Sequence, residues 1–276
     1  MIKLATVTIR SFLSYLLYHN VCPEYKENID QARTSCDIAQ KDLWNNQQLT
    51  SQGPGDFNKG CSTLFGGVFF DSYVEDGKWV NTKDTSVKMT GTIARKVVKF
   101  ALAAARSDTQ VIRFHELEKQ GALRAMRVED IDGFEVTAVV PPDPSVCEFY
   151  KVHAPDLQPV GTVLGKAYRD PGKPEFDLPP EESDQGESDG LPAEEFEFFL
   201  EESLLKFCYP GMKVMTSVFE LNSGMHFFDD VFTAYSSIYT DLGNDLMIGW
   251  KKPKAYDGDC RDDAEESDSE KEDKKP

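Results

Sequence analysis

Histidine is scarce in this chain, and its cysteines are not clustered. Four histidines and six cysteines occur among 276 residues, and no Cys-x-x-Cys pair is present. His19 and Cys22 have a spacing that can begin a metal site, but the remaining histidines form no pair. The pattern indicates neither a zinc site nor a small disulfide scaffold, and it favours a reducing compartment. We expect no metal and no cofactor.

Apolar runs of membrane-spanning length are also missing. A transmembrane helix needs about 20 consecutive apolar residues. The apolar stretch near the N-terminus is interrupted by Arg10, and no small-residue cleavage pattern follows it. We therefore expect a soluble intracellular protein with no membrane partner.

Catalytic motifs are not recognisable either. The glycine-rich stretch GPGDFNKGCSTLFGG has Lys before Gly, the reverse of the order that cradles phosphates. Asp229 and Asp230 are adjacent, so in a strand their side chains would point to opposite faces and would not form a carboxylate dyad. No serine or cysteine has a nucleophile elbow around it. We expect no catalytic residue and a protein that is not an enzyme.

Negative charge is concentrated in two segments. The formal net charge is -18, and residues 176–197 hold nine acids and no base, while residues 257–276 hold ten acids and four bases. Segments of this kind repel themselves and resist collapse. We therefore predict a disordered acidic insertion over 171–195 and a disordered acidic tail over 257–276.

Residues 88–127 are basic, with nine bases and three acids. Such a region can contact RNA or an acidic partner, or it can be a solvated helix face and strand edge that the protein's own acidic segments partly neutralise. The residues that would make an RNA or partner contact are Arg95, Lys96, Lys99, Arg106, Arg113, Arg124 and Arg127.

The spacing of apolar residues predicts a helical region over 1–109. Steps of three and four residues lead from Tyr25 through Ile29, Ala32, Cys36 and Ala39 to Leu43, which predicts a long helix near 24–49. Further helices are expected near 9–19 and 89–106. The glycine-rich aromatic segment after Leu49 is expected to form a tight turn, and Asp76-Gly77 predicts a small hairpin within Asp71 to Thr85.

From residue 110 the pattern is typical of strands, in β-rich regions over 110–170 and 196–256. Asn222-Ser223-Gly224 lies between two apolar runs and predicts a hairpin. For FEFFLEESLL, residue propensity does not decide between a helix and a strand. The expected fold class is α+β, a helical N-terminal part followed by a mainly antiparallel β part. The predicted strands are VIRFH, ALRAMRV, FEVTAVV, CEFYKV and VGTVLGKAY.

A series of segments resembles the fungal Argonaute-binding subunit of the Argonaute siRNA chaperone complex. The resemblance runs from about Phe12 to Pro253 and is interrupted at the acidic insertion. It implies a non-enzymatic subunit that acts with a second chaperone subunit and holds Argonaute loaded with duplex small RNA. The segments that carry it are FLSYLLYHNVCPEY, ARTSCDIAQKDLW, GPGDFNKGCSTLFGG, PGMKVMTSVFELNSGMHFFDD and LGNDLMIGWKKP.

This resemblance also implies a cellular role. Family members are associated with restraint of slicing and of passenger-strand release, and with RNA-directed heterochromatin formation. The chain would therefore contact small RNA indirectly, through Argonaute, and the expected locations are the nucleus and the cytoplasm.

Tryptophans and the acidic tail supply further candidate sites. Gly249-Trp250 fits a hook that inserts into tryptophan pockets on Argonaute, or a buried residue that follows the apolar run Leu246 to Ile248. We predict Gly249, Trp250, Trp44 and Trp79 as partner-binding residues. Ser267 and Ser269, each with a glutamate three residues later, are candidate phosphorylation sites.

Two other function classes stay open. In one, the chain is itself an RNA-binding module that acts through residues 88–127 with a salt-dependent affinity for duplex RNA. In the other, it is an enzyme whose site is not visible in a single sequence.

Overall fold

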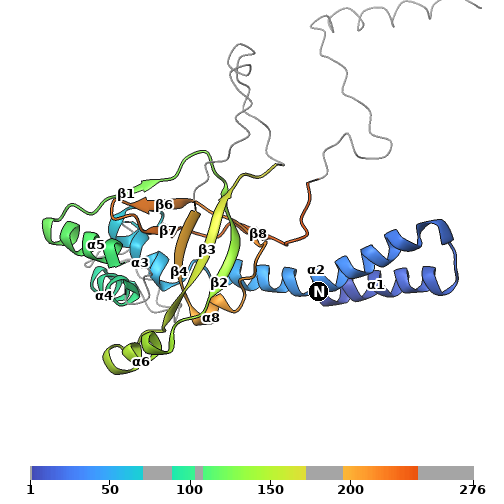
Figure 1. Cartoon of the computed structure of the whole chain (residues 1–276), viewed down its shortest axis with the longest axis horizontal. Helices are drawn as coiled ribbons and strands as arrows, with labels where there is room; N and C mark the ends of the chain where they lie inside the picture. The colour runs from blue at the N-terminus through green and yellow to red at the C-terminus, as the bar shows by residue number, and fades with distance from the viewer. Residues whose placement is uncertain (1, 71–88, 103–107, 172–194, 242–276) are drawn as a thin grey trace, which may run out of the picture. The chain divides into compact units, whose positions relative to one another are not determined.

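The structure is a computed structural model that describes residues 2–70, 89–102, 108–171 and 195–241 (Figure 1). The predicted hairpin within Asp71 to Thr85, most of the predicted insertion and the predicted tail lie outside these ranges, and they stay predictions. Six predicted site residues also lie outside them: Trp79, Arg106, Gly249, Trp250, Ser267 and Ser269.

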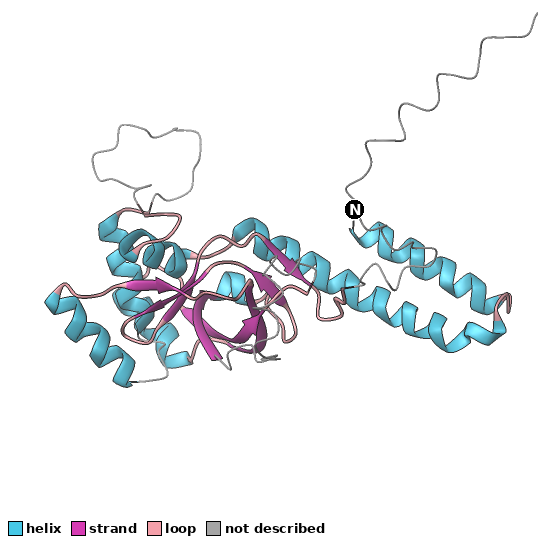
Figure 2. Ribbon diagram, turned by 90° about the horizontal axis from the view of Figure 1, so that it is seen from above, coloured by secondary structure: helices cyan, strands magenta, loops and turns pink. Residues whose placement is uncertain are grey.

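The N-terminal part is a pair of helices. Helix α1 (Ile2–Tyr18) is followed by a short 3-10 turn, η1 (Pro23–Tyr25), and by the long helix α2 (Lys26–Gln52). Figures 1 and 2 both show α1 lying along the first part of α2. The long helix near 24–49 is confirmed, whereas the first helix begins well before residue 9. Its first turn is supported by Thr6, whose hydroxyl donates to the carbonyls of Ile2 and Lys3.

The segment after α2 corrects one prediction. The expected tight turn is instead a short break followed by helix α3 (Asp56–Phe65). Glycine at position 60 argues against a helix by propensity alone. However, Gly60 packs against α4 (Gly91–Ala101), where an added Cβ would lie 3.4 Å from the carbonyl oxygen of Ala94. Close approach of two helices, and not a turn, explains this glycine.

Two predicted strands are wrong, because VIRFH and CEFYKV belong to helices. VIRFH lies in α5 (Asp108–Gln120), where Phe114 is buried against α3 and α4, and CEFYKV lies in α6 (Pro144–His153). Asp143 caps α6 by accepting a hydrogen bond from the Ser145 N–H at 2.8 Å. The sequence Asp143-Pro144 is a helix-start signal that outweighs the strand propensity of the residues after it.

The strands of the described ranges form two antiparallel sheets. The larger has the order β4-β3-β2-β5-β8 and the smaller the order β1-β6-β7. Strands β6 and β7 are joined by Asn222-Ser223-Gly224, which confirms the predicted hairpin. The segment FEFFLEESLL, for which the sequence did not decide between helix and strand, is strand β4 followed by the short helix α8 (Glu202–Leu205). The strands are β1 (Ala125–Arg127), β2 (Gly133–Val140), β3 (Val160–Tyr168), β4 (Glu195–Glu201), β5 (Lys213–Met215), β6 (Val218–Leu221), β7 (His226–Phe228) and β8 (Thr233–Tyr235).

Strand β4 links two apolar cores. Side chains alternate along a strand, so Phe198 and Leu200 enter a core with β2 and β5, while Phe199 enters a core with α3, α4 and α5. The predicted α+β class with antiparallel strands is confirmed. Strands from 110–170 and from 196–256 share the larger sheet, and the proposed division of the chain into regions stays a prediction.

Candidate partner-binding surfaces

The outer face of α1 is apolar and exposed to solvent. Leu4, Val7, Tyr15 and Tyr18 follow one another at helical spacing, and their side chains are 72%, 44%, 56% and 85% exposed. The charged residues of α1 are Lys3 and Arg10, and Arg10 is directed to α2, where its Nε lies 2.8 Å from Oδ1 of Asp37. The stripe from Leu4 to Tyr18, with Ser11 between, therefore carries no charge.

Helix α2, the second helix of the pair, also carries an exposed tryptophan. Trp44, one of the predicted partner-binding residues, is 54% exposed. Of the apolar stripe predicted on α2, Ile29 is buried, whereas Tyr25 and Leu43 at its two ends are exposed. An exposed tryptophan on a helix is a typical contact residue of protein interfaces.

Polar side chains attach α2 to the sheet. The carboxylate of Asp42 accepts hydrogen bonds from the hydroxyls of Ser236 and Ser237 at 2.6 and 2.8 Å. Asn46 donates to the carbonyl of Ala234 and accepts from the hydroxyl of Tyr209 at 2.7 Å. Apolar periodicity could not have identified these two buried residues as contacts, because they are polar. Their effect is to hold the second half of α2 against β8.

A second set of buried polar groups holds α3 in place. The Asn58 side-chain amide donates to the carbonyls of Pro54 and Phe199 at 2.9 and 3.2 Å, and its oxygen accepts from the Phe228 N–H at 3.1 Å. At the start of the same helix, Oε1 of Glu201 accepts from the Phe57 N–H at 2.9 Å. Asn58 and Glu201 thus join α3 to two strands.

Burial changes the proton affinity of two carboxyl groups near α3. Desolvation raises the pKa of Glu201 to about 7, partly opposed by the hydrogen bond from Phe57. Desolvation also raises the pKa of Asp229, which accepts from the Val68 N–H at 3.0 Å. A carboxyl with a pKa near 7 can act as an acid or a base, but Glu201 contacts backbone N–H groups at a helix start. We interpret it as a capping group.

The predicted basic residues lie on several elements and are partly neutralised. Lys96 on α4 pairs with Asp156 at 2.7 Å, and Lys99 pairs with Glu118 of α5 at 3.0 Å. These two lysines are therefore partly neutralised by acids of the described fold. The remaining described residues of the predicted set are all exposed: Arg95, Arg113, Arg124 and Arg127.

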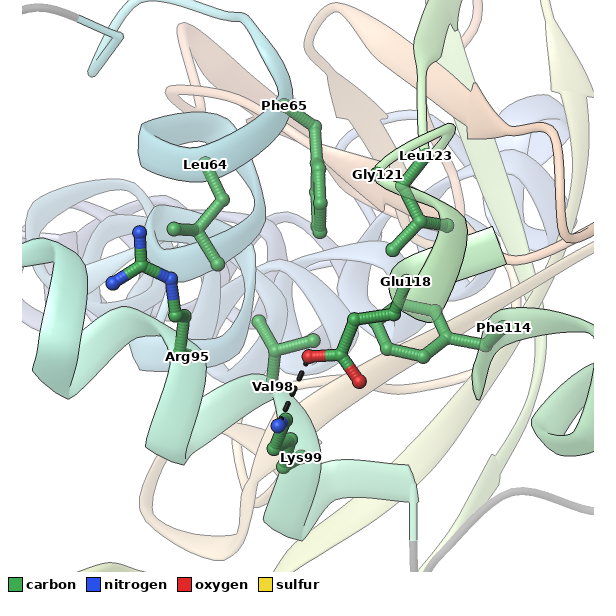
Figure 3. A pocket seen from close by; sticks show the side chains of 9 residues that line it. All are labelled: Leu64, Phe65, Arg95, Val98, Lys99, Phe114, Glu118, Gly121 and Leu123. Atoms are coloured by element: carbon green, nitrogen blue, oxygen red, sulfur yellow. Dashed lines mark ion pairs between the residues drawn. The ribbon is translucent and has the colours of Figure 1, made fainter. Parts of the chain in front are cut away.

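A pocket lies where α3, α4 and α5 meet (Figure 3). Its volume is about 230 Å³. Arg95 and the Lys99–Glu118 ion pair are the charged groups that line it. The apolar lining residues are Leu64, Phe65, Val98, Phe114 and Leu123. Arg95 and Lys99 could be named from the sequence, but the pocket could not, because its walls come from three separate helices.

The described ranges contain neither a cluster of metal ligands nor a membrane-spanning helix. No group of three or more His, Cys, Asp or Glu side chains there is placed to hold a metal ion. No helix of the described chain has the length and apolar character needed to cross a membrane.

Comparison with known proteins gave one match. The family model of Argonaute siRNA chaperone (ARC) complex subunit Arb1 matches residues 1–253. No curated protein and no solved structure matches the chain. The matched region includes all the segments on which the resemblance was based, and it covers most of the 276 residues. The resemblance is confirmed, and the chain belongs to the family of Argonaute siRNA chaperone (ARC) complex subunit Arb1.

Proposed function

We propose that this chain is a non-enzymatic subunit that, with a second chaperone subunit, binds Argonaute loaded with duplex siRNA. By holding that complex it restrains slicing and passenger-strand release, in the nucleus and the cytoplasm, as a step in RNA-directed heterochromatin silencing. Membership of a family of Argonaute chaperone-complex subunits supports the partner and the type of assembly.

The exposed apolar face of α1 is the observation that carries this proposal. Contiguous apolar surface on a soluble protein commonly marks a protein interface. Each large side chain that becomes buried contributes about 1.5–3 kcal/mol before the costs of association. Leu4, Tyr15 and Tyr18 are each more than half exposed, and Trp44 lies on the helix that supports them. We propose that Argonaute binds this face.

Placing glutamates at Leu4 and Tyr15 should weaken Argonaute binding at least about tenfold. The double variant would bury two carboxylates in an apolar interface, and burial of unpaired charge is strongly unfavourable. The measurement is the Kd of the full chain for purified siRNA-loaded Argonaute, by surface plasmon resonance. Lys151→Glu on the exposed surface of α6 is the control, because it changes the net charge by the same amount and lies outside α1 and α2. An unchanged Kd for the double variant would exclude this face as the interface.

Wild-type protein should slow cleavage of a target and release of the passenger strand in a reconstituted Argonaute reaction. The variant with glutamate at Leu4 and Tyr15 should not, because it no longer holds Argonaute. Release of labelled passenger strand over time is the readout. Equal cleavage and release rates with and without the wild-type protein would contradict the proposed restraint.

A second candidate function is direct binding of RNA by residues 88–127. The exposed Arg113, Arg124 and Arg127 support it, because arginines at a surface attract phosphates. The ion pairs of Lys96 and Lys99 argue against it. A mobility shift of labelled duplex RNA by the isolated protein at low salt, lost when these arginines are changed to glutamate, is the expected result. A duplex that does not shift at low salt contradicts this function.

A further inference from the structure

The pocket between α3, α4 and α5 has apolar walls. Phe65 and Phe114 meet edge to face, with ring centroids 6.3 Å apart and an interplanar angle of 84°. Leu64 and Val98 complete the wall on the side of α3 and α4, as Figure 3 shows. Phe114 and Val98 are almost fully buried, at 2% and 1% exposure. The walls are therefore parts of a packed core, and the pocket keeps its shape without a ligand.

The size of the pocket limits what can occupy it. Sites for drug-sized ligands and cofactors have volumes of about 300–1,000 Å³, and this pocket has about 230 Å³. That volume suits a single large side chain. Interfaces between proteins often place one aromatic or aliphatic anchor of the partner in a pocket of this kind, and that anchor carries much of the binding energy.

The charge around the pocket favours a ligand that has an acidic residue next to the anchor side chain. Arg95 is exposed and has no ion-pair partner among the described residues. Glu118, the acid of the lining, is engaged by Lys99 at 3.0 Å and lies 3.5 Å from Nδ1 of His115. The guanidinium of Arg95 is thus the charge available to a ligand, and it matches a carboxylate in geometry.

We propose that this pocket binds an acidic peptide segment of a partner protein. One aromatic or large aliphatic side chain of the segment fills the pocket, and a flanking carboxylate pairs with Arg95. A nucleobase fits less well, because a wall of Leu64, Val98 and Phe114 offers no hydrogen-bond partner to the polar edges of a base. The pocket shares no residue with the outer face of α1, so this proposal does not rest on the Argonaute interface proposed above.

A synthetic peptide tests the proposal with the full chain. The probe is a fluorescein-labelled eleven-residue peptide with one central tryptophan among aspartates and glutamates, and binding is followed by fluorescence anisotropy at low salt. Changing the tryptophan of the peptide to alanine should weaken binding about 30-fold, the effect expected for a buried anchor. Equal binding of the two peptides would overturn the proposal.

Variants of the protein test the role of the charge. Arg95→Glu should weaken binding of the tryptophan peptide at least about fivefold, because an attraction is replaced by a repulsion at the rim. Lys41→Glu on α2 is the matched control and should leave the Kd unchanged. Equal losses in the two variants would mean that the peptide responds only to net charge, and would contradict the proposal.

Methyl resonances locate the ligand without any substitution. Leu64, Val98 and Leu123 line the pocket, so their methyl signals should shift when the tryptophan peptide is added to the wild-type protein. Signals from Leu4 and Val7 on α1 should not move. Shifts confined to other residues, or larger shifts of the pocket methyls with a labelled RNA duplex than with the peptide, would overturn the assignment.

Discussion

Replacing Asn58 with alanine should lower the free energy of unfolding by about 4 kcal/mol. Asn58 is fully buried and makes three hydrogen bonds to backbone groups, at 2.9, 3.2 and 3.1 Å. Its loss leaves the carbonyls of Pro54 and Phe199 and the N–H of Phe228 without these bonds. Each buried polar group left without a partner costs about 1–3 kcal/mol. A loss of this size is a large part of the 5–15 kcal/mol that stabilises an ordinary domain.

Urea unfolding of the full chain, followed by circular dichroism, measures this change. Asn45→Ala is a suitable control, because Asn45 also lies in a helix but is partly exposed. The control should change the free energy of unfolding by less than about 0.5 kcal/mol. A loss below about 1 kcal/mol for Asn58→Ala would show that the hydrogen bonds of Asn58 contribute little to holding α3.

Replacing Glu201 with glutamine should remove a pH dependence of stability. Burial raises the pKa of Glu201 from 4.5 to about 7 in the folded chain. Below pH 4.5 the carboxyl is protonated in both the folded and unfolded states, so it causes no penalty. Between the two pKa values the carboxyl is ionised in the unfolded chain but still protonated in the folded chain. Stability therefore falls as pH rises through this range. Above pH 7 the carboxyl is ionised in both states, and the full penalty of burying its charge applies.

The expected size of this effect follows from the two pKa values. A difference of one pKa unit corresponds to about 1.4 kcal/mol. The wild type should therefore lose about 2–3 kcal/mol relative to Glu201→Gln between pH 5 and pH 8, because glutamine stays neutral while its carbonyl oxygen still accepts from Phe57. Asp229, whose pKa is also raised by burial, is present in both proteins and cancels in the comparison.

Urea unfolding of both proteins over this pH range provides the test. Glu202→Gln, a change at the exposed neighbouring position, should follow the wild-type pH dependence. If the difference between Glu201→Gln and the wild type is the same at pH 5 and pH 8, then Glu201 is not the titrating group.

Local sequence patterns were enough to predict most of the regular elements. The stripe beginning at Tyr25 predicted the long helix, and the turn Asn222-Ser223-Gly224 predicted the hairpin between β6 and β7. These signals are local, because the residues that carry them are neighbours in the element they form. The two wrong strand predictions also came from local patterns. VIRFH and CEFYKV are rich in β-branched and aromatic residues, but each occupies a helix that buries part of its apolar side.

The candidate surfaces also include features that the sequence could predict and features that it could not. Trp44 and the bases of α4 could be named from sequence, because residue type and the spacing of neighbouring residues are read directly from it. The pocket could not be named, because Leu64, Val98 and Phe114 lie on three helices. The partner of Lys96 could not be named either, since Lys96 pairs with Asp156, 60 residues away.

From the order of residues alone one could know the α+β class, the long helix, the hairpin and the family, since all four depend on patterns within short segments or on their order. Folding decided how α3 is held, which face of α1 stays open, and where a pocket forms. Glu201 lies 144 residues from Phe57, whose N–H it caps. Asn58 lies 170 residues from Phe228, whose N–H donates to its side-chain oxygen. Contacts over such separations depend on the packing of the whole chain, because no local preference brings these groups together.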